Sequence, residues 1–82
     1  MPPLLDAPAI YRIVIQGWLD SSWSDSFGDM VINNEVAADG TQLTVLSGRL
    51  VDQAALFGVL NGLYGLGFAL LSVECFEINS AA

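Results

Sequence analysis

The clearest pattern in the sequence is a run of apolar residues at helical spacing in its second half. Between Ala55 and Leu66, apolar side chains recur every three or four residues, the spacing that places them on one face of an α-helix. Asp52 precedes the run and can cap its first turn, and Gly65 and Gly67 favour its end. We therefore predict a helix with a buried stripe. This stripe comprises Ala55, Leu56, Val59, Leu60, Leu63 and Leu66.

Four other segments have the composition of β-strands. Residues 11–19 and 68–78 are rich in β-branched, aromatic and aliphatic side chains. Residues 30–36 and 41–50 flank an Asp39-Gly40 pair, which is a strong hairpin signal. Both faces of 11–19 carry apolar residues, so we predict a central strand covered on both sides.

A polar segment, Asp20 to Gly28, separates the first two strands and has room for two helical turns at most. Ser22 and Asp25 resemble a capping box with Asp in the place of Glu. Trp23 and Phe27 are four residues apart and would meet on one helical face. We predict that both aromatic rings belong to the core.

The order of these elements is strand, short helix, strand, hairpin, strand, long helix and strand. It matches an α+β, ferredoxin-like split βαβ sandwich with a shortened first helix and a four-stranded antiparallel sheet. We expect one domain over residues 10–78. Residues 1–9, with three prolines, are expected to form a flexible N-terminal arm, and residues 79–82 a tail.

A membrane-spanning helix is an alternative for residues 53–73, which carry no charge and include a Gly58-x-x-x-Gly62 pair. The run is flanked by Asp52 and Glu74, and no Lys or Arg anchors either end. Glycines in its second half indicate a helix end followed by a strand. We therefore predict a soluble helix–turn–strand and do not expect the chain to associate with a membrane.

Composition indicates that the chain needs a partner. A chain of 82 residues buries only about 60% of its unfolded surface, yet 54% of these residues are hydrophobic and 13% are charged. Cys75 is the only cysteine and there is no histidine, so neither an internal disulfide nor a zinc site can reinforce the core. Self-association is the remaining reinforcement, and one unpaired thiol favours a cytoplasmic location.

The net charge of −7 restricts the partners further. Arg12 and Arg49 are the only basic residues. Nucleic acids and anionic membrane surfaces both attract proteins through clustered Lys and Arg side chains. We therefore expect neither of them to be a partner.

No residue constellation for catalysis is present. Without histidine, the commonest general base is missing and no serine or cysteine has an imidazole partner. Cys75 lies between Glu74 and Glu77, whose charges disfavour a thiolate nucleophile. The aspartates of the polar segment lack the spacing of a calcium loop. We predict no catalytic residue, no cofactor and no metal site, and expect a non-enzymatic protein.

Three long motifs resemble a group of uncharacterised small bacterial proteins. They are Trp23-Ser24-x-x-Phe27, LxGxLxDQAALxGxL over residues 46–60, and LxxLGxxLLSV over residues 63–73. The resemblance covers about residues 11–76 and implies a soluble α+β domain without a known activity. Members of the group tend to have polar residues on the outer side of the long helix. This chain differs there by having Phe57, Gly62, Tyr64 and Gly65.

These observations favour a self-assembling structural or interaction module that forms a homo-oligomer through apolar helix and sheet surfaces. The predicted interface residues are Trp18, Phe57, Asn61 and Tyr64. Trp18 lies on the more polar face of its strand, and the aromatic residues of the helix lie away from its leucine stripe. The alternative function is a small-molecule-binding or regulatory domain with an apolar cleft near Trp18 and Trp23.

Overall fold

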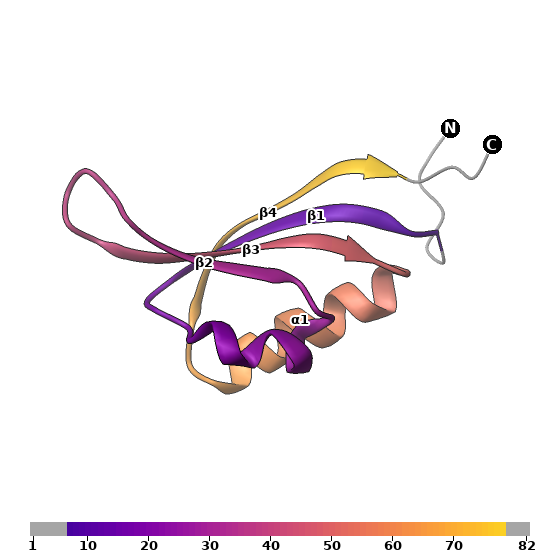
Figure 1. The fold of residues 1–82 in the computed structure, drawn as a ribbon, viewed down its shortest axis with the longest axis horizontal. Coiled ribbons are helices and arrows are strands. Elements are labelled where there is room, and N and C mark those ends of the chain that lie inside the picture. Colours follow the sequence, from indigo (N-terminus) through magenta and orange to yellow (C-terminus); the bar gives the residue numbers. More distant parts are fainter. Residues whose placement is uncertain (1–6, 79–82) are drawn as a thin grey trace.

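The structure is a computed structural model that describes residues 7–78. The predicted arm over residues 1–9 and the predicted tail over 79–82 therefore lie mostly or wholly outside the described residues. In chain order the elements are β1 (Ala9–Gln16), a 3₁₀ helix η1 (Ser21–Phe27), β2 (Val31–Val36), β3 (Gln42–Leu50), α1 (Gln53–Gly65) and β4 (Ala69–Ile78) (Figure 1).

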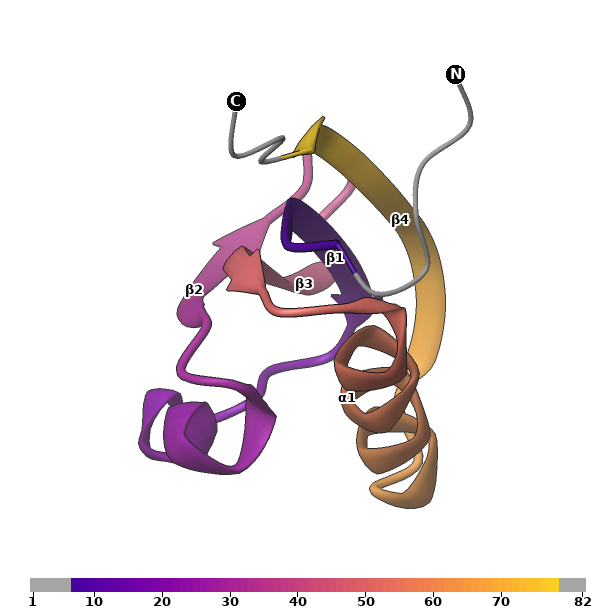
Figure 2. The same cartoon turned by 90° about the vertical axis from the view of Figure 1, so that its right-hand side faces the viewer.

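The strands form one antiparallel sheet with the order β2-β3-β1-β4. Both helices lie on the same face of this sheet, η1 toward the β2 side and α1 toward the β4 side (Figures 1 and 2). The prediction of a small α+β domain with a four-stranded antiparallel sheet is therefore confirmed. The prediction of a layer on both faces of β1 is wrong for the described residues. Val14 and Val45, paired across strands on the second face, are nonetheless nearly fully buried.

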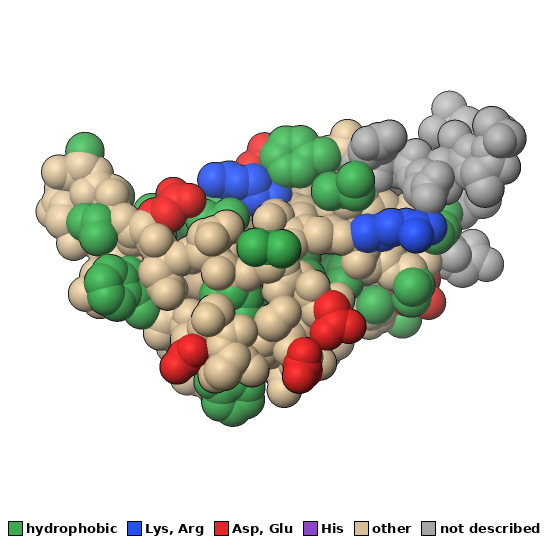
Figure 3. Space-filling model, in the orientation of Figure 1, with side chains coloured by type: hydrophobic (Ala, Val, Ile, Leu, Met, Phe, Trp, Pro, Cys, Tyr) green, Lys and Arg blue, Asp and Glu red, His purple; other side chains and the backbone are tan. Residues whose placement is uncertain are grey.

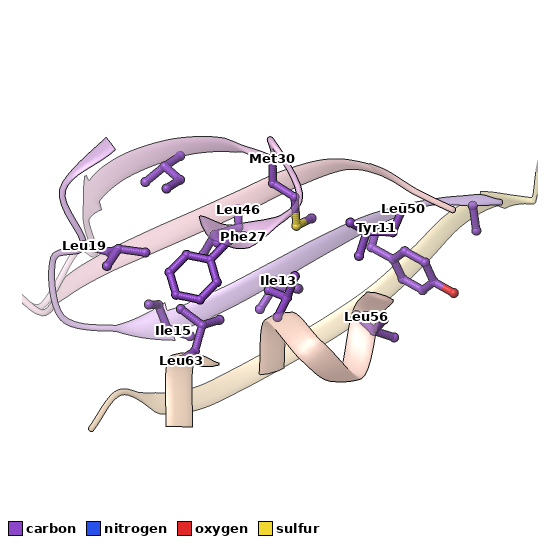
Figure 4. Close-up of a cluster of buried hydrophobic side chains, with 13 residues drawn as sticks. Tyr11, Ile13, Ile15, Leu19, Phe27, Met30, Leu46, Leu50, Leu56 and Leu63 are labelled. Atoms are coloured by element: carbon purple, nitrogen blue, oxygen red, sulfur yellow. The ribbon is translucent and has the colours of Figure 1, made fainter. Parts of the chain in front are cut away.

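The core lies between the sheet and the two helices, as Figure 4 shows. Alternate side chains of β1 point into it because successive residues of a strand face opposite sides. Tyr11, Ile13 and Ile15 are all at most 5% exposed. They pack in one cluster with Leu19, Phe27, Met30, Ile32, Leu46, Leu50, Leu56, Val59 and Leu63.

β1 differs from the predicted strand at both ends. It begins at Ala9, which is 2% exposed, so the predicted flexible arm does not extend that far. It ends at Gln16, because Gly17 takes a left-handed φ of 109° that turns the chain. The Gly17 N–H donates a hydrogen bond of 2.7 Å to the Gln42 carbonyl. Leu19 re-enters the core after this turn.

The N-cap of η1 differs from the predicted one. Asp20, not Ser22, is the N-cap, and its carboxylate accepts a hydrogen bond of 3.0 Å from the Ser22 N–H. Phe27 is buried as predicted. The prediction of a core position for Trp23 is wrong, since 41% of it is exposed. The centroid of its ring lies 6.1 Å from that of Phe27.

α1 follows the predicted pattern closely. The Asp52 carboxylate caps it, accepting a hydrogen bond of 2.8 Å from the Ala55 N–H. Leu66 is the C-cap and is 43% exposed, so it lies outside the buried stripe. Across the described residues, neither helix has the length and apolar character required to cross a membrane.

A buried hydroxyl joins β3 to the turn after β1. Thr44 is 0% exposed, and its Oγ1 accepts hydrogen bonds from the Leu19 N–H at 3.0 Å and the Asn34 amide at 2.9 Å. The same hydroxyl donates to the Gly17 carbonyl at 2.7 Å. It thereby satisfies the backbone groups that leave the sheet where β1 ends.

Candidate interaction surface

The outer face of α1 carries no charged side chain. A surface helix normally presents charged and polar residues to water on the side opposite its core stripe. Here the exposed residues are Ala54, Phe57, Gly58, Asn61, Tyr64 and Gly65. The exposed fractions of Phe57 and Tyr64 are 57% and 82%. The face is therefore apolar although it borders solvent in the isolated chain.

The two flanks of α1 differ in what they face. On one flank, Gly62 lies against the ring of Phe27 from η1. On the other flank, Leu60 and Tyr64 line a cleft together with Ala69 and Leu70 at the beginning of β4. Phe57 precedes Tyr64 by seven residues, which is two helical turns, and so lies on this second flank.

A cleft of about 460 Å³ separates this second flank from β4. Its only polar side chains are the amide of Asn61 and the hydroxyl of Tyr64. The lining residues are Ile15, Leu60, Asn61, Leu63, Tyr64, Phe68, Ala69 and Leu70. The cleft exists because α1 packs against η1 and β3 and leaves β4 largely uncovered.

β4 is one edge of the sheet, and among residues 7–78 its only strand neighbour is β1. An edge strand presents unpaired N–H and C=O groups along its outer side. β4 is also apolar and largely exposed: Leu70, Leu71 and Phe76 are each more than half exposed, and Val73 is 38% exposed. We call the exposed flank of α1 together with β4 the α1–β4 surface.

The pairing of β4 with β1 is interrupted twice. Register shifts occur between Ile10 and Tyr11 and between Val14 and Ile15. The stretch from Ser72 to Cys75, opposite Val14 to Tyr11, is regular between them. Within it, Arg12 forms an ion pair of 3.2 Å with Glu74. These two side chains are on the face away from the helices, whereas Val73 is paired with Ile13 and shares its core-side face.

The structure brings together three of the four predicted interface residues. Phe57, Asn61 and Tyr64 all lie on the exposed part of α1, and two of them line the cleft. Trp18 lies elsewhere: 52% of it is exposed, and its indole N–H donates to the Glu35 carbonyl of β2 at 3.4 Å. The exposed side chains of β4 were not predicted. Their hydrophobicity is visible in the sequence, but their position at an uncovered edge is a property of the tertiary structure.

The cleft between α1 and β4 is not the one predicted near Trp18 and Trp23. Neither tryptophan contributes to its lining. Trp23 stacks obliquely on Phe27, with 32° between the ring planes, and so fills space beside η1. An apolar cleft is present, but it is next to α1 and β4.

Acidic groups concentrate around η1 and β2, toward the edge of the sheet opposite β4. Five of the nine acidic residues fall between residues 20 and 39, in η1, in β2 and in the hairpin after it. In that hairpin, hydrogen bonds from Thr41 lower the pKa of the exposed Asp39 carboxyl below its ordinary value. In the orientation of Figure 3, acidic groups are spread over the surface, with two of them adjacent, and hydrophobic side chains reach the surface in several places.

The described residues offer few groups for metal binding or for reactive side-chain chemistry. Residues 7–78 hold no group of three or more carboxylate or thiol side chains close enough to share a metal ion. The Cys75 thiol is exposed on β4. Burial raises the pKa of Tyr11, and the nearby Cys75 and Asp52 raise it further. Its ring is a core element, so this shift has a structural origin.

The fold and this surface define a class of protein: a small α+β domain with one uncovered sheet edge beside an uncharged helix. The chain belongs to the family described as a domain of unknown function, DUF8691, whose model matches residues 10–74. The matched range extends from β1 into β4 and thus includes every element of the fold. Searches of curated proteins and of solved structures give no significant match.

Proposed function

We propose that this chain is a non-enzymatic structural or interaction module that works as a homo-oligomer through its α1–β4 surface. The observation that carries the proposal is the outer face of α1, which exposes Phe57 and Tyr64 without a single charged neighbour on the helix. Helices that are apolar on all sides are normally buried. A second copy is the partner that covers this face in the proposal.

The exposed area is sufficient for such a role. Phe57, Tyr64 and Phe76 expose 57%, 82% and 61% of their surface, which amounts to on the order of 400 Å² if an aromatic residue contributes roughly 200 Å². Leu70 and Leu71 are each about half exposed and add to this area. A stable interface buries about 800 Å² on each partner. The apolar anchors alone therefore supply about half of what a specific interface needs.

The charge distribution also supports self-association on this side. Two copies that each carry a charge of −7 repel one another. The repulsion is smallest when the acidic regions around η1 and β2 point away from the partner. α1 has no charged residue, and β4 has none from Ala69 to Val73, so contact through this surface keeps most carboxylates apart.

We also propose a more specific fold class for the domain. The strand order β2-β3-β1-β4, with antiparallel neighbours throughout, supports a ferredoxin-like split βαβ sandwich in which η1 takes the place of the first helix. The exposed, unpaired thiol of Cys75 supports a cytoplasmic location, where thiols stay reduced.

The experiment is a measurement of molar mass by light scattering over a range of protein concentrations. We expect a mass of at least two chains, and a shift toward the monomer in Phe57→Glu and Tyr64→Glu. The matched control is Val36→Glu, because Val36 is 61% exposed but lies on β2, at the other edge of the sheet. A wild-type monomer at all concentrations, or an equal effect of the control, would contradict the proposal.

A second candidate function is supported by the cleft between α1 and β4. Its volume of about 460 Å³ is within the range of small-molecule sites, and Asn61 and Tyr64 supply two polar groups beside apolar walls. A regulatory or binding domain would use this cleft for a neutral, mainly apolar ligand. Saturable binding of an apolar fluorescent dye to the wild type, abolished by Leu60→Trp and without change of mass, would favour this candidate over self-association.

A further inference from the structure

We infer that the partner on the α1–β4 surface is a second copy whose β4 strand pairs antiparallel with β4 of the first, continuing the sheet across a two-fold axis near Val73. The inference rests on the proposed self-association and specifies its geometry. It follows from three observations: the open edge of β4, the placement of both helices on one face, and the regular stretch between the two register shifts.

The edge of β4 offers hydrogen bonds as well as apolar contacts. Proteins usually protect an edge strand with charges, prolines, bulges or a covering element. From Ala69 to Val73 this strand has neither a charge nor a proline, and α1 leaves it uncovered. The two register shifts interrupt the strand, but the segment from Ser72 to Cys75 between them is regular and able to pair.

With a two-fold axis, the same interface can include contacts between the two β4 strands and contacts between the two α1 helices. Antiparallel pairing of two identical edge strands places the axis perpendicular to the sheet, so both copies keep the same face on the same side. Both α1 helices then lie on one face, on either side of the paired β4 strands. The flank of α1 that carries Phe57 and Tyr64 faces β4, and so it faces the partner's helix across the axis.

The register follows from side-chain alternation and charge. Directly opposed residues of an antiparallel pair point to the same face of the sheet. In a symmetric pair of β4 strands, one residue therefore lies opposite the same residue of the partner, and the two-fold axis passes between these two residues. Within the regular stretch, Val73 and Glu74 are central. An axis at Glu74 would oppose two like charges, which is unfavourable. An axis at Val73 instead opposes Leu71 to the partner's Cys75 and Leu70 to the partner's Phe76.

Cysteine cross-linking tests this register directly, because Cys75 is the only native thiol. Opposed Cα atoms in an antiparallel pair are about 4.5–5.5 Å apart, within the range of a disulfide. In a Cys75→Ser background, Val73→Cys should form covalent dimers in high yield on mild oxidation. Leu71→Cys with the native Cys75 should do so as well. The wild type should not, since its two thiols are offset by four residues, or about 13 Å along the strands.

The matched control is Val36→Cys in the Cys75→Ser background, which puts a similarly exposed thiol on the opposite edge of the sheet. We expect no covalent dimer from it beyond random collision. If Val73→Cys does not fold, amide hydrogen exchange of the wild type tests the same β4–β4 pairing. Outward-facing amides of β4 should exchange at least tenfold more slowly at high protein concentration than at low concentration, whereas β2 amides should not change.

The outcomes separate this inference from the proposed function. A dimeric mass with no cross-link through Val73 and no concentration-dependent protection of β4 would overturn the edge pairing and leave self-association intact. A monomeric mass would contradict both. Protected β4 amides in a monomer would overturn the inference too, since another segment of the same chain would then cover the edge.

Discussion

The backbone of Gly62 and the ring of Phe27 are in such close contact that a Cβ atom at Gly62 would lie 2.6 Å from Cε1 of the ring. This contact joins α1 to η1 and explains why a glycine is placed in the middle of a helix, where it is normally unfavourable. It also fixes the rotation of α1 about its axis. The flank opposite Gly62 is thereby turned toward β4.

Substitution of Gly62 by alanine should destabilise the protein. Overpacking costs about 1–3 kcal/mol, and the higher helix propensity of alanine recovers at most about 1 kcal/mol. We expect a net loss of up to about 2 kcal/mol in the free energy of unfolding, measured by urea denaturation at a fixed low protein concentration. Gly58→Ala is the control, because nothing lies within 4 Å of its added Cβ. It should raise stability by up to about 1 kcal/mol, and equal effects at both sites would contradict the packing argument.

Replacing Thr44 by valine should be more costly than its similar volume suggests. Valine removes the hydroxyl that bonds the Leu19 N–H and the Gly17 carbonyl, and leaves these backbone groups without that partner. Buried unsatisfied groups cost about 1–3 kcal/mol each, so we expect a loss of about 2–4 kcal/mol on urea denaturation. Thr44→Ser keeps the hydroxyl and should retain most of the stability. A valine variant as stable as the serine variant would argue against this role.

Alkaline pH should weaken the fold through Tyr11. Its pKa in the folded protein is raised above the ordinary value near 10, and burial is the largest cause. The native state therefore holds the phenol proton more tightly than the unfolded state. This contribution to stability is fully present below about pH 10 and is lost as pH rises through the folded-state pKa. Tyr11→Phe should show a smaller decrease in unfolding free energy between pH 9 and pH 11 than the wild type. An unchanged decrease would mean that other groups cause it.

Salt should strengthen self-association. Each copy carries a net charge of −7, and mobile ions screen the repulsion between copies without weakening apolar contacts. We expect the dissociation constant to fall severalfold when sodium chloride is raised from about 20 to about 300 mM, where the Debye length becomes shorter. Sedimentation equilibrium at each salt concentration measures this. A dissociation constant that rises with salt would indicate an interface held by ion pairs, contrary to the apolar α1–β4 surface.

Local sequence patterns predicted most of the secondary structure correctly. Helical spacing and the Asp52 cap identified α1, and the Asp39-Gly40 pair identified the hairpin, where Gly40 has a left-handed φ of 88°. The errors arose where two local signals compete. Ser22 and Asp25 have the spacing of a capping box, but η1 begins at Ser21, so Asp20 is the N-cap and its carboxylate accepts the hydrogen bond from the Ser22 N–H.

The interaction surface was predictable only in part. The absence of charge on the outer side of α1 is visible in the sequence, and it led to Phe57, Asn61 and Tyr64. The exposure of Trp23 and of the β4 side chains depends on which strand lies at the edge and where the helices pack. Residues far apart in the chain determine both. The position of Trp18 near Glu35, away from the other three, has the same origin.

The central place of β1 has a consequence for how the protein folds as it is made. Among the described elements β1 is synthesised first, yet its neighbours in the sheet are β3 and β4, and the Arg12–Glu74 pair joins residues 62 positions apart. Among the described elements, β1 therefore gains its second neighbour only after β4, the last of them, has been synthesised. Such long-range pairing slows folding. Until β4 is synthesised, β1 of the nascent chain has no strand to pair with on that side.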